Sequence, residues 1–231
     1  MSCKFSFAIL QLADDSLRHT YPKTGLIFAF TSSTSILYTI STFPSIVMDS
    51  MRYSPISAHP EKARISGLLQ AFEERFGRRP TIVICVPGRV NLIGEHVDYC
   101  GYAVLPMAIE QSILVAVAQS DTTKVVLQNT KTDKYPNFEC DLEGGVDIDL
   151  SGGPKWHNYF LCGIKGVLQD AGMTSSKGMW GLIDGTIPPS AGLSSSSALV
   201  VAGALGMYPL QFGSMTFSLR SSVSYRVGQR V

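Results

Sequence analysis

The sequence has 231 residues, of which 45% are hydrophobic and 16% are charged, a composition that fits one globular core and excludes a disordered chain. The net charge of +1 gives no reason to expect a nucleic acid or an anionic membrane as a partner. Five cysteines without a CxxC spacing argue against a disulfide framework or a zinc site, so we expect a reducing, cytoplasmic location.

Residues 1–55 are expected to form a poorly structured or alternative N-terminal extension. Within them, residues 24–48 are uncharged and long enough for a membrane span, but many Ser and Thr residues and Pro44 dilute their apolar character. A secretory signal is also a poor match, because Asp14 and Asp15 interrupt the apolar run at residues 5–12. An extension is therefore favoured, with a signal and a membrane anchor left as alternatives.

The first clear element is a helix that begins near Pro60 and ends at Gly77, residues that suit the first turn and the stop of a helix. Its apolar residues recur at helical spacing: Ile65, Leu68, Leu69, Phe72 and Phe76. Residues 81–86 then indicate a short buried strand that ends at Pro87.

Three more strands are predicted, at residues 112–118, 125–127 and 178–184, with a turn at residues 120–123. The glycine pairs in residues 141–154 indicate a loop. A second helix is expected over residues 156–169, with Gly172 as its cap.

A Gly/Pro/Ser-rich stretch, residues 185–197, leads into an Ala/Leu/Val-rich helix that is expected to end at Leu205. No reliable element is predicted from Gly206 onward. The order of elements predicts one mixed α/β domain over residues 56–205 and a divergent tail over residues 206–231.

The first chemical motif, GTIPPSAGLSSSSA, spans residues 185–198. Its glycines let the backbone approach a ligand, and its serines lie where a helix begins, so free amides and the positive end of the helix dipole suit a phosphate group. Serine hydroxyls could also ligate a Mg²⁺ ion that bridges phosphates. The alternative is a flexible serine-rich loop with an ordinary N-cap. No GxxxxGK[ST] sequence is present, which excludes a P-loop NTPase.

The second motif, PGRVNLIGEHVDY, spans residues 87–99 and combines Arg89, Glu95, His96 and Asp98. Clustered donors and acceptors suit a polyhydroxylated ligand, because each hydroxyl both donates and accepts a hydrogen bond. Arg89 could also stabilise negative charge that develops during group transfer. A solvated surface cluster is the alternative, whereas a metal site lacks the HExxH spacing.

Trp156, Asn158 and Tyr159 form a third group of interest. An aromatic ring beside an amide could border an adenine base. Aromatic residues at the start of a helix are, however, more often part of the core. The sequence leaves both interpretations open and favours the core.

Together the first two motifs resemble the galactokinase branch of the GHMP kinases, the superfamily of galactokinase, homoserine, mevalonate and phosphomevalonate kinases. Residues 87–99 are similar to the galactokinase signature, and residues 185–198 to the superfamily's phosphate loop. Within that branch, residues 98–108 and 156–163 look most like animal N-acetylgalactosamine kinase. The resemblance extends from about Pro60 to Gly203.

The resemblance implies an ATP- and Mg²⁺-dependent kinase for the anomeric hydroxyl of galactose or N-acetylgalactosamine, acting as a monomer. It implies that Arg89 binds the sugar and stabilises the transferring phosphoryl group. Glu95, His96 and Asp98 would bind sugar hydroxyls. The ATP phosphates would be held by Gly192, Leu193, Ser194, Ser195, Ser196 and Ser197, with Ser196 as the Mg²⁺ ligand. The implied α/β (α+β) fold is the ribosomal-protein-S5 domain-2-like GHMP kinase N-terminal domain, with its left-handed crossover.

The resemblance also indicates missing parts. Galactokinases place an Asp beyond the phosphate loop to orient or deprotonate the sugar hydroxyl, and a Glu before it to help hold Mg²⁺, but here no Asp or Glu follows Asp184. We therefore expect that the C-terminal domain is absent and that truncation impairs turnover. The alternative is a non-catalytic sugar- or nucleotide-binding remnant or splice product of such a kinase.

Overall fold

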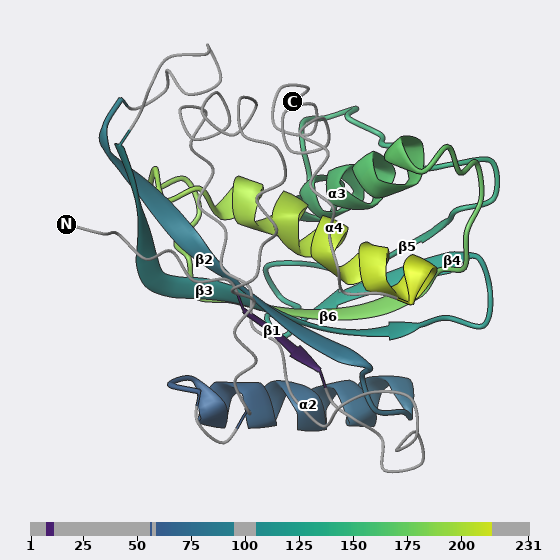
Figure 1. Cartoon of the computed structure of the whole chain (residues 1–231), viewed down its shortest axis with the longest axis horizontal. Helices are drawn as coiled ribbons and strands as arrows, with labels where there is room; N and C mark the ends of the chain where they lie inside the picture. The colour runs from purple at the N-terminus through teal and green to yellow at the C-terminus, as the bar shows by residue number, and fades with distance from the viewer. Residues whose placement is uncertain (1–7, 12–55, 57–58, 95–104, 214–231) are drawn as a thin grey trace, which may run out of the picture.

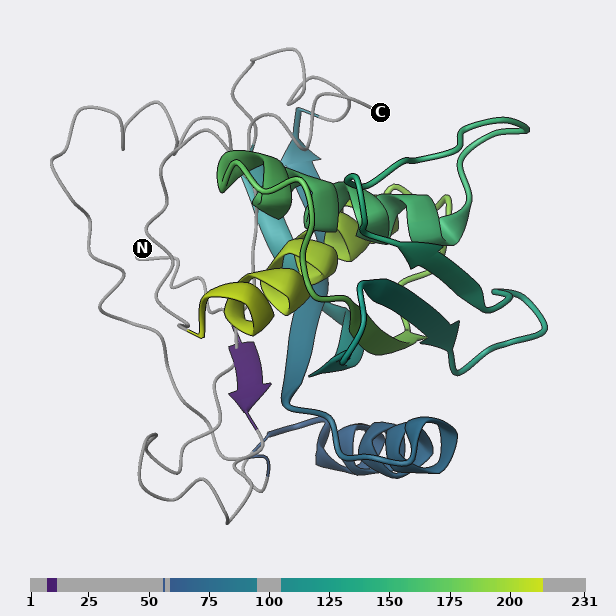
Figure 2. The ribbon, with the colours of Figure 1, turned by 90° about the vertical axis from the view of Figure 1, so that its right-hand side faces the viewer.

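The computed structural model describes residues 8–11, 56, 59–94 and 105–213 (Figures 1 and 2). In chain order its elements are β1 (Ala8–Gln11), α2 (Lys62–Phe76), β2 (Ile82–Ile93), β3 (Leu105–Gln119), β4 (Lys124–Asn129), β5 (Phe138–Asp141), α3 (Trp156–Asp170), β6 (Met179–Gly185) and α4 (Ser195–Phe212). The strands form one sheet in the order β1-β2-β3-β6-β4-β5. Helix α2 covers one face of this sheet, and α3 and α4 cover the other (Figure 1).

The predicted first helix is confirmed as α2, which begins two residues after Pro60 and is closed by Gly77. Gly77 has φ 67°, a left-handed conformation that glycine adopts without the steric cost of a Cβ atom, and its N–H donates to the Glu73 carbonyl. Of the predicted apolar stripe, Ile65, Leu68 and Phe72 are fully buried against the sheet.

The expectation that a strand ends at Pro87 is wrong, because β2 continues to Ile93. Pro87 lies opposite Ser112, whose N–H and carbonyl both bond Thr186 in the chain beyond β6. The backbone N–H and carbonyl of Ser112 therefore point toward Thr186 and away from β2. The missing N–H of Pro87 consequently removes no hydrogen bond between β2 and β3. The register then shifts between Pro87 and Arg89.

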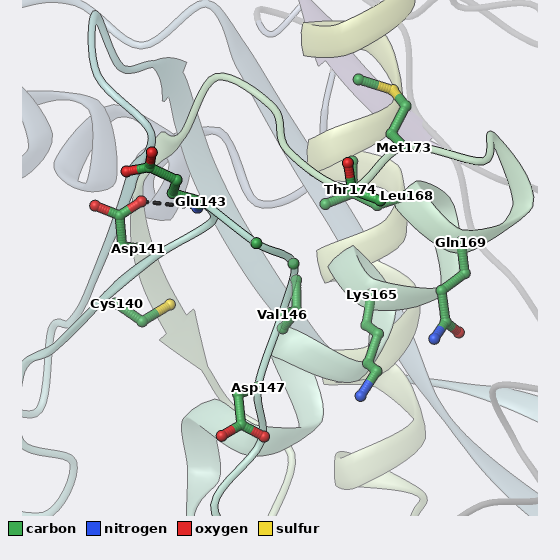
Figure 3. A pocket seen from close by; sticks show the side chains of 12 residues that line it. Cys140, Asp141, Glu143, Val146, Asp147, Lys165, Leu168, Gln169, Met173 and Thr174 are labelled. Carbon is green, nitrogen blue, oxygen red and sulfur yellow. Dashed lines mark hydrogen bonds between the residues drawn. The ribbon is translucent and has the colours of Figure 1, made fainter.

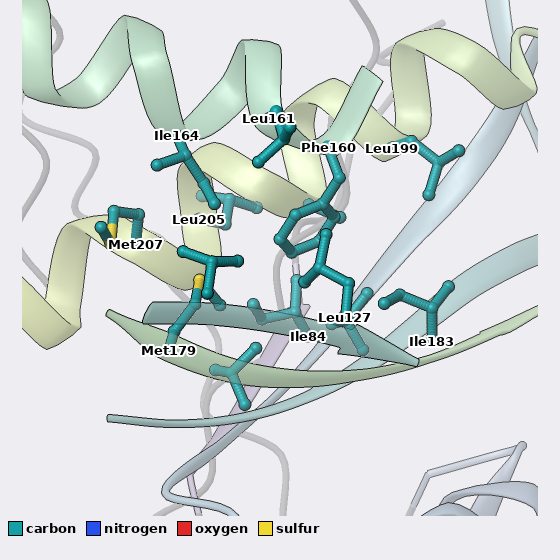
Figure 4. Close-up of a cluster of buried hydrophobic side chains, with 14 of the residues drawn as sticks. Ile84, Leu127, Phe160, Leu161, Ile164, Met179, Ile183, Leu199, Leu205 and Met207 are labelled. Carbon is teal, nitrogen blue, oxygen red and sulfur yellow. The ribbon is translucent and has the colours of Figure 1, made fainter. Parts of the chain in front are cut away.

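Alternation along the central strands divides the core into two layers. Ile82, Ile84 and Val86 of β2 face α3 and α4, whereas Val83 and Cys85 face α2. Strand β3 alternates in the same way and β6 contributes to both layers. The larger layer, between the sheet and α3 and α4, is centred on Phe160, Ile164 and Leu127 (Figure 4). Both faces of the sheet are therefore sealed by helices.

Helix α4 lies between the sheet and α3 (Figure 1) and runs further than predicted. The expectation of no element from Gly206 onward is wrong for residues 206–212. Gly206 packs against the sheet, and Met207 and Pro209 are buried, so tertiary packing keeps the helix intact past Gly206 and through Pro209, two residues that weaken isolated helices.

The other predicted elements are confirmed: β3, β4 and α3 are longer than predicted, and β6 is shifted by one residue along the chain. The chain after α3 turns at Gly172, which has a left-handed φ of 67° and follows the cap residue Ala171. Strands β1 and β5 were not predicted. The parallel pair β4–β6 is joined through β5 and α3, and the hand of this crossover stays a prediction.

The expected N-terminal extension and tail lie largely outside the described residues, and the domain boundaries at residues 56 and 205 stay predictions. None of the helices in the described part of the chain combines the length and apolar character that a membrane span requires.

Candidate active site

The phosphate-loop motif forms the connection from β6 to α4. Its backbone has left-handed φ values at Ser190 (57°), Gly192 (70°) and Ser194 (59°). Such values are uncommon for residues with a side chain and are found where surrounding contacts fix the backbone, often at ligand sites. The loop therefore turns sharply just before the helix.

The N-terminus of α4 is open to a ligand. Its cap residue, Ser194, makes no side-chain capping bond, and the first turn contains no acidic residue. Ser195 is half-buried, while Ser196 and Ser197 are exposed. The amides of a first helical turn have no partner within the helix, so this end of α4 offers donors and a positive dipole to an anion.

The sugar-signature motif and the phosphate loop are in direct contact through their backbones. The Arg89 N–H donates to the Leu193 carbonyl at 3.1 Å. At Gly88 a Cβ atom would lie 2.9 Å from the same Leu193 oxygen and 2.8 Å from the Ile109 side chain. Two segments that are far apart in the sequence thus lie against each other, and a glycine permits the close approach.

Of the predicted sugar-site residues, the structure places Arg89 on β2, half-buried and next to the phosphate loop. Glu95, His96 and Asp98 lie outside the described residues. Gly192, Leu193 and Ser194 lie in the loop, and Ser195, Ser196 and Ser197 form the first turn of α4. The structure therefore brings Arg89 together with the predicted phosphate-binding residues.

A polar cluster that the sequence did not indicate lies at the start of the loop. We call it the Arg64 cluster; its members are Glu61, Arg64, Ser112, Asp184 and Thr186. The Arg64 guanidinium donates to the carboxylates of Asp184 and Glu61, to the Ser112 hydroxyl at 2.8 Å and carbonyl at 3.1 Å, and to the Asp184 carbonyl at 2.7 Å. The Ser112 carbonyl also accepts bonds from the Thr186 N–H (3.0 Å) and hydroxyl (3.1 Å).

The cluster is electrostatically matched. Burial alone would raise the pKa of Asp184, but hydrogen bonds from Thr130 and Arg64 and the positive charges of Arg64 and Lys131 lower it below its ordinary value. Burial would lower the pKa of Arg64, but its bonds to Asp184 and Glu61 raise it. Both groups are therefore charged at neutral pH.

The third group identified from the sequence has structural contacts. The Asn158 amide is buried and donates to the Asp149 carbonyl at 2.8 Å. The Trp156 indole donates to the Pro136 carbonyl at 3.1 Å, and both Trp156 and Tyr159 pack against the larger core. These contacts agree with the core interpretation.

A pocket of about 540 Å³ lies elsewhere, between the end of β5 and the end of α3 (Figure 3). Its charged lining residues are Asp141, Glu143, Asp147 and Lys165. It shares no lining residue with the phosphate loop or with Arg89. The chemistry of the two motifs therefore does not belong to this pocket.

Two family models match the chain. The galactokinase galactose-binding signature matches residues 70–119, and the N-terminal domain of GHMP kinases matches residues 158–220. The crystal structure of Lactococcus lactis galactokinase complexed with galactose is similar with a TM-score of 0.56 and 30% identity, over 72% of this chain and 41% of that chain. The chain thus has the fold of a GHMP kinase N-terminal domain.

Sequence comparison with individual galactokinases identifies the family within the GHMP kinases. The chain is 39% identical to galactokinase of Candida parapsilosis, over 67% of this chain and 31% of the relative. It is 36% identical to galactokinase of Candida maltosa, over 71% of this chain and 76% of the relative. This chain belongs to the galactokinase family. It nevertheless spans less than a third of the length of the Candida parapsilosis relative.

Proposed function

We propose that this chain binds Mg-ATP and a galactose-type sugar in the manner of a sugar 1-kinase, with galactose or N-acetylgalactosamine as substrate. The observation that carries the proposal is the 3.1 Å hydrogen bond from the Arg89 N–H to the Leu193 carbonyl. It holds the sugar-signature segment against the phosphate loop, as transfer between two bound substrates requires.

In this proposal the nucleotide phosphates bind Gly192, Leu193 and the four serines at residues 194–197. The open amides at the start of α4 and the absence of acidic residues in its first turn fit an anion. Ser196 is exposed and is our proposed Mg²⁺ ligand, since a hydroxyl oxygen is a suitable ligand for this hard cation. Mg²⁺, when bound, would neutralise charge on the phosphates.

The sugar binds beside Arg89, with Glu95, His96 and Asp98 as proposed partners of its hydroxyls. In the transfer step the anomeric oxygen forms a bond to the γ-phosphorus while the bond from that phosphorus to the ADP oxygen breaks. The hydroxyl proton leaves the anomeric oxygen for a water molecule. Arg89 would stabilise the negative charge on the transferring group, because a guanidinium keeps its positive charge throughout the reaction.

A binding role with little turnover is the second candidate, and one sequence observation favours it. Residues 185–231 contain no Asp or Glu, so this segment supplies no carboxylate base. Loss of a general base costs about two to four orders of magnitude in rate. In this second candidate role the chain binds its substrates and transfers the phosphoryl group slowly. A monomeric state, a cytoplasmic location and the absence of nucleic-acid partners remain proposals.

An ADP-release assay of the purified chain, with Mg-ATP and either galactose or N-acetylgalactosamine, tests the proposal. Sugar-dependent ADP release that Arg89→Ala lowers by about ten-fold or more would support the kinase role. Saturable binding of sugar and nucleotide without ADP release would support the binding role. A folded chain that neither binds nor turns over either substrate would contradict both.

A further inference from the structure

The Arg64 cluster connects the phosphate loop to distant parts of the fold. The side chains of Arg64 and Asp184 are only 18% and 17% exposed. Their ion pair joins α2 to β6 on the face of the sheet opposite α4. Asp184 is the residue before the end of β6, and the phosphate loop begins at Thr186. Asp184 therefore lies two residues before the first residue of the loop.

The bonds within the cluster converge on one backbone oxygen. The Ser112 carbonyl accepts from Arg64 and from both the N–H and the hydroxyl of Thr186, while the Ser112 N–H donates to the Thr186 hydroxyl at 3.0 Å. Arg64 thus fixes the same strand segment that fixes the first residue of the loop. The Ser112 hydroxyl donates to Glu61 at 2.8 Å, which ties this segment to the start of α2.

The loop is consequently held at both ends. Thr186 is bonded to Ser112 at one end, and Leu193 is bonded to Arg89 at the other. Between them Ser190 has a left-handed φ of 57°, which in a residue with a side chain persists only where surrounding contacts determine it. Release of one end is therefore expected to change the shape of the loop.

We propose that Arg64 and Asp184 are positioning residues of the phosphate site, and that their ion pair holds the start of the loop so that the amides at the N-terminus of α4 keep the arrangement that binds the ATP phosphates. This inference rests on the proposed function and deepens it. Neither residue touches the nucleotide in this account; Arg64 acts through Ser112 and Thr186, and Asp184 acts by holding Arg64.

Hydrogen–deuterium exchange of the full chain provides the test. In Asp184→Asn we expect amide exchange in residues 186–194 to be about ten-fold faster, and exchange in residues 113–118 at the centre of β3 to change less than about two-fold. The matched control is Asp121→Asn, which breaks the exposed ion pair between Asp121 and Arg78. The side chain of Asp121 is 82% exposed and that of Arg78 is 41% exposed. The control should leave both segments unchanged.

A second variant keeps the test decisive if Asp184→Asn fails to fold. Thr186→Val removes the hydroxyl bonds to Ser112 and keeps the size of the side chain, so it should raise exchange in residues 186–194 in the same way. Equal acceleration of exchange in residues 186–194 and 113–118 would mean that the Arg64–Asp184 pair has a general structural role. Unchanged exchange in residues 186–194 would mean that the pair does not hold the loop. Either result would overturn the inference.

Binding measurements separate this inference from the proposed function. We expect the Kd for Mg-ATP to rise about ten-fold in the variants, which corresponds to about 1.4 kcal/mol, while the Kd for galactose stays within about two-fold. Equal weakening of both ligands would overturn a specific role at the phosphate site. If the parent chain fails to bind Mg-ATP, the proposed function is contradicted, and the exchange result alone then decides whether the pair holds the loop.

Discussion

Single residues determine how closely the two motifs can lie, and Gly88 is the clearest case. Its missing side chain leaves room for the Leu193 carbonyl and the Ile109 side chain, both of which a Cβ atom would meet at less than 3.0 Å. The Ile109 side chain can move, but the Leu193 oxygen belongs to the backbone of the phosphate loop. The separation of the motifs therefore depends on this glycine.

Gly88→Ala should push the Leu193 carbonyl away and loosen the loop. We expect a loss of about 1–3 kcal/mol in the free energy of unfolding, measured by urea titration, and weaker Mg-ATP binding. Gly185→Ala is the matched control, because its Cβ would meet only Ile113, at an ordinary 3.9 Å. Equal effects of the two substitutions would contradict the account of this contact.

Burial of the Cys85 thiol makes the free energy of unfolding depend on pH in the alkaline range. Burial, together with the negative charge of Glu61, raises the pKa of its thiol from 9.0 to about 12. The unfolded chain therefore loses this proton at lower pH than the folded chain, so the stabilisation is fully present below pH 9 and declines as the pH rises toward 12.

Between pH 7.5 and pH 10.5 we expect Cys85 to contribute a loss of about 2 kcal/mol in unfolding free energy, by the linkage of pKa to stability. Urea titrations at the two pH values measure it. Cys85→Ala removes this titration and should show a smaller loss over the same interval. An identical loss in both chains would show that other groups cause the alkaline destabilisation.

At the scale of elements, the close packing of α3 on α4 fixes the helix whose N-terminus is the proposed phosphate site. A Cβ atom at Gly203 would lie 2.1 Å from the Phe160 carbonyl, and one at Gly163 would lie 2.1 Å from the Val200 carbonyl. The two glycines thus let the backbones of both helices approach each other. The position of α4 depends on this reciprocal contact.

Gly203→Ala should force the helices apart. We expect a lower melting temperature and a loss of at least about 2 kcal/mol in stability, because the clash is with backbone atoms that cannot rotate away. Gly67→Ala in α2, where a Cβ meets nothing within 4 Å, should instead stabilise by about 0.5–1 kcal/mol. Thermal unfolding by circular dichroism compares the two, and a neutral Gly203→Ala would contradict the packing account.

The periodicity of apolar residues predicted the elements that carry a regular apolar stripe or an apolar run. The stripe from Ile65 to Phe76 gave α2, and the apolar run at residues 112–118 gave the centre of β3. Residues 87–93 of β2 and residues 206–212 of α4 were missed, because Pro87, Gly206 and Pro209 are tolerated there only through tertiary contacts. Local sequence does not contain those contacts.

The candidate site shows the same division. Its two motifs could be predicted because their residues are contiguous in the sequence. The Arg64 cluster could not, because it joins residues from α2, β3 and β6 that carry no local pattern; Arg64 looks like an ordinary polar residue on a helix. Only the pairing of β3 with β6 brings Ser112 and Thr186 together.

At the scale of the whole molecule, one sheet covered on both faces places the site at one end of its interior strands. The β2–β3 pair, the end of β6 and the N-terminus of α4 meet at the same end of the sheet (Figure 1). The two core layers fix these elements from opposite faces. A site built on elements held in this way is well suited to keep two ligands in a defined relative position.

Titration of Mg-ATP into the full chain, followed by calorimetry, tests the central claim most directly. We predict saturable binding that Gly192→Val weakens by about ten-fold or more, because a β-branched side chain disfavours the left-handed φ of 70° in the phosphate loop. Gly152→Val is the control, since Gly152 has a similar φ of 78° in a loop that contains no predicted site residue. Absence of saturable binding by the folded parent chain, or equal weakening by both substitutions, would contradict the account.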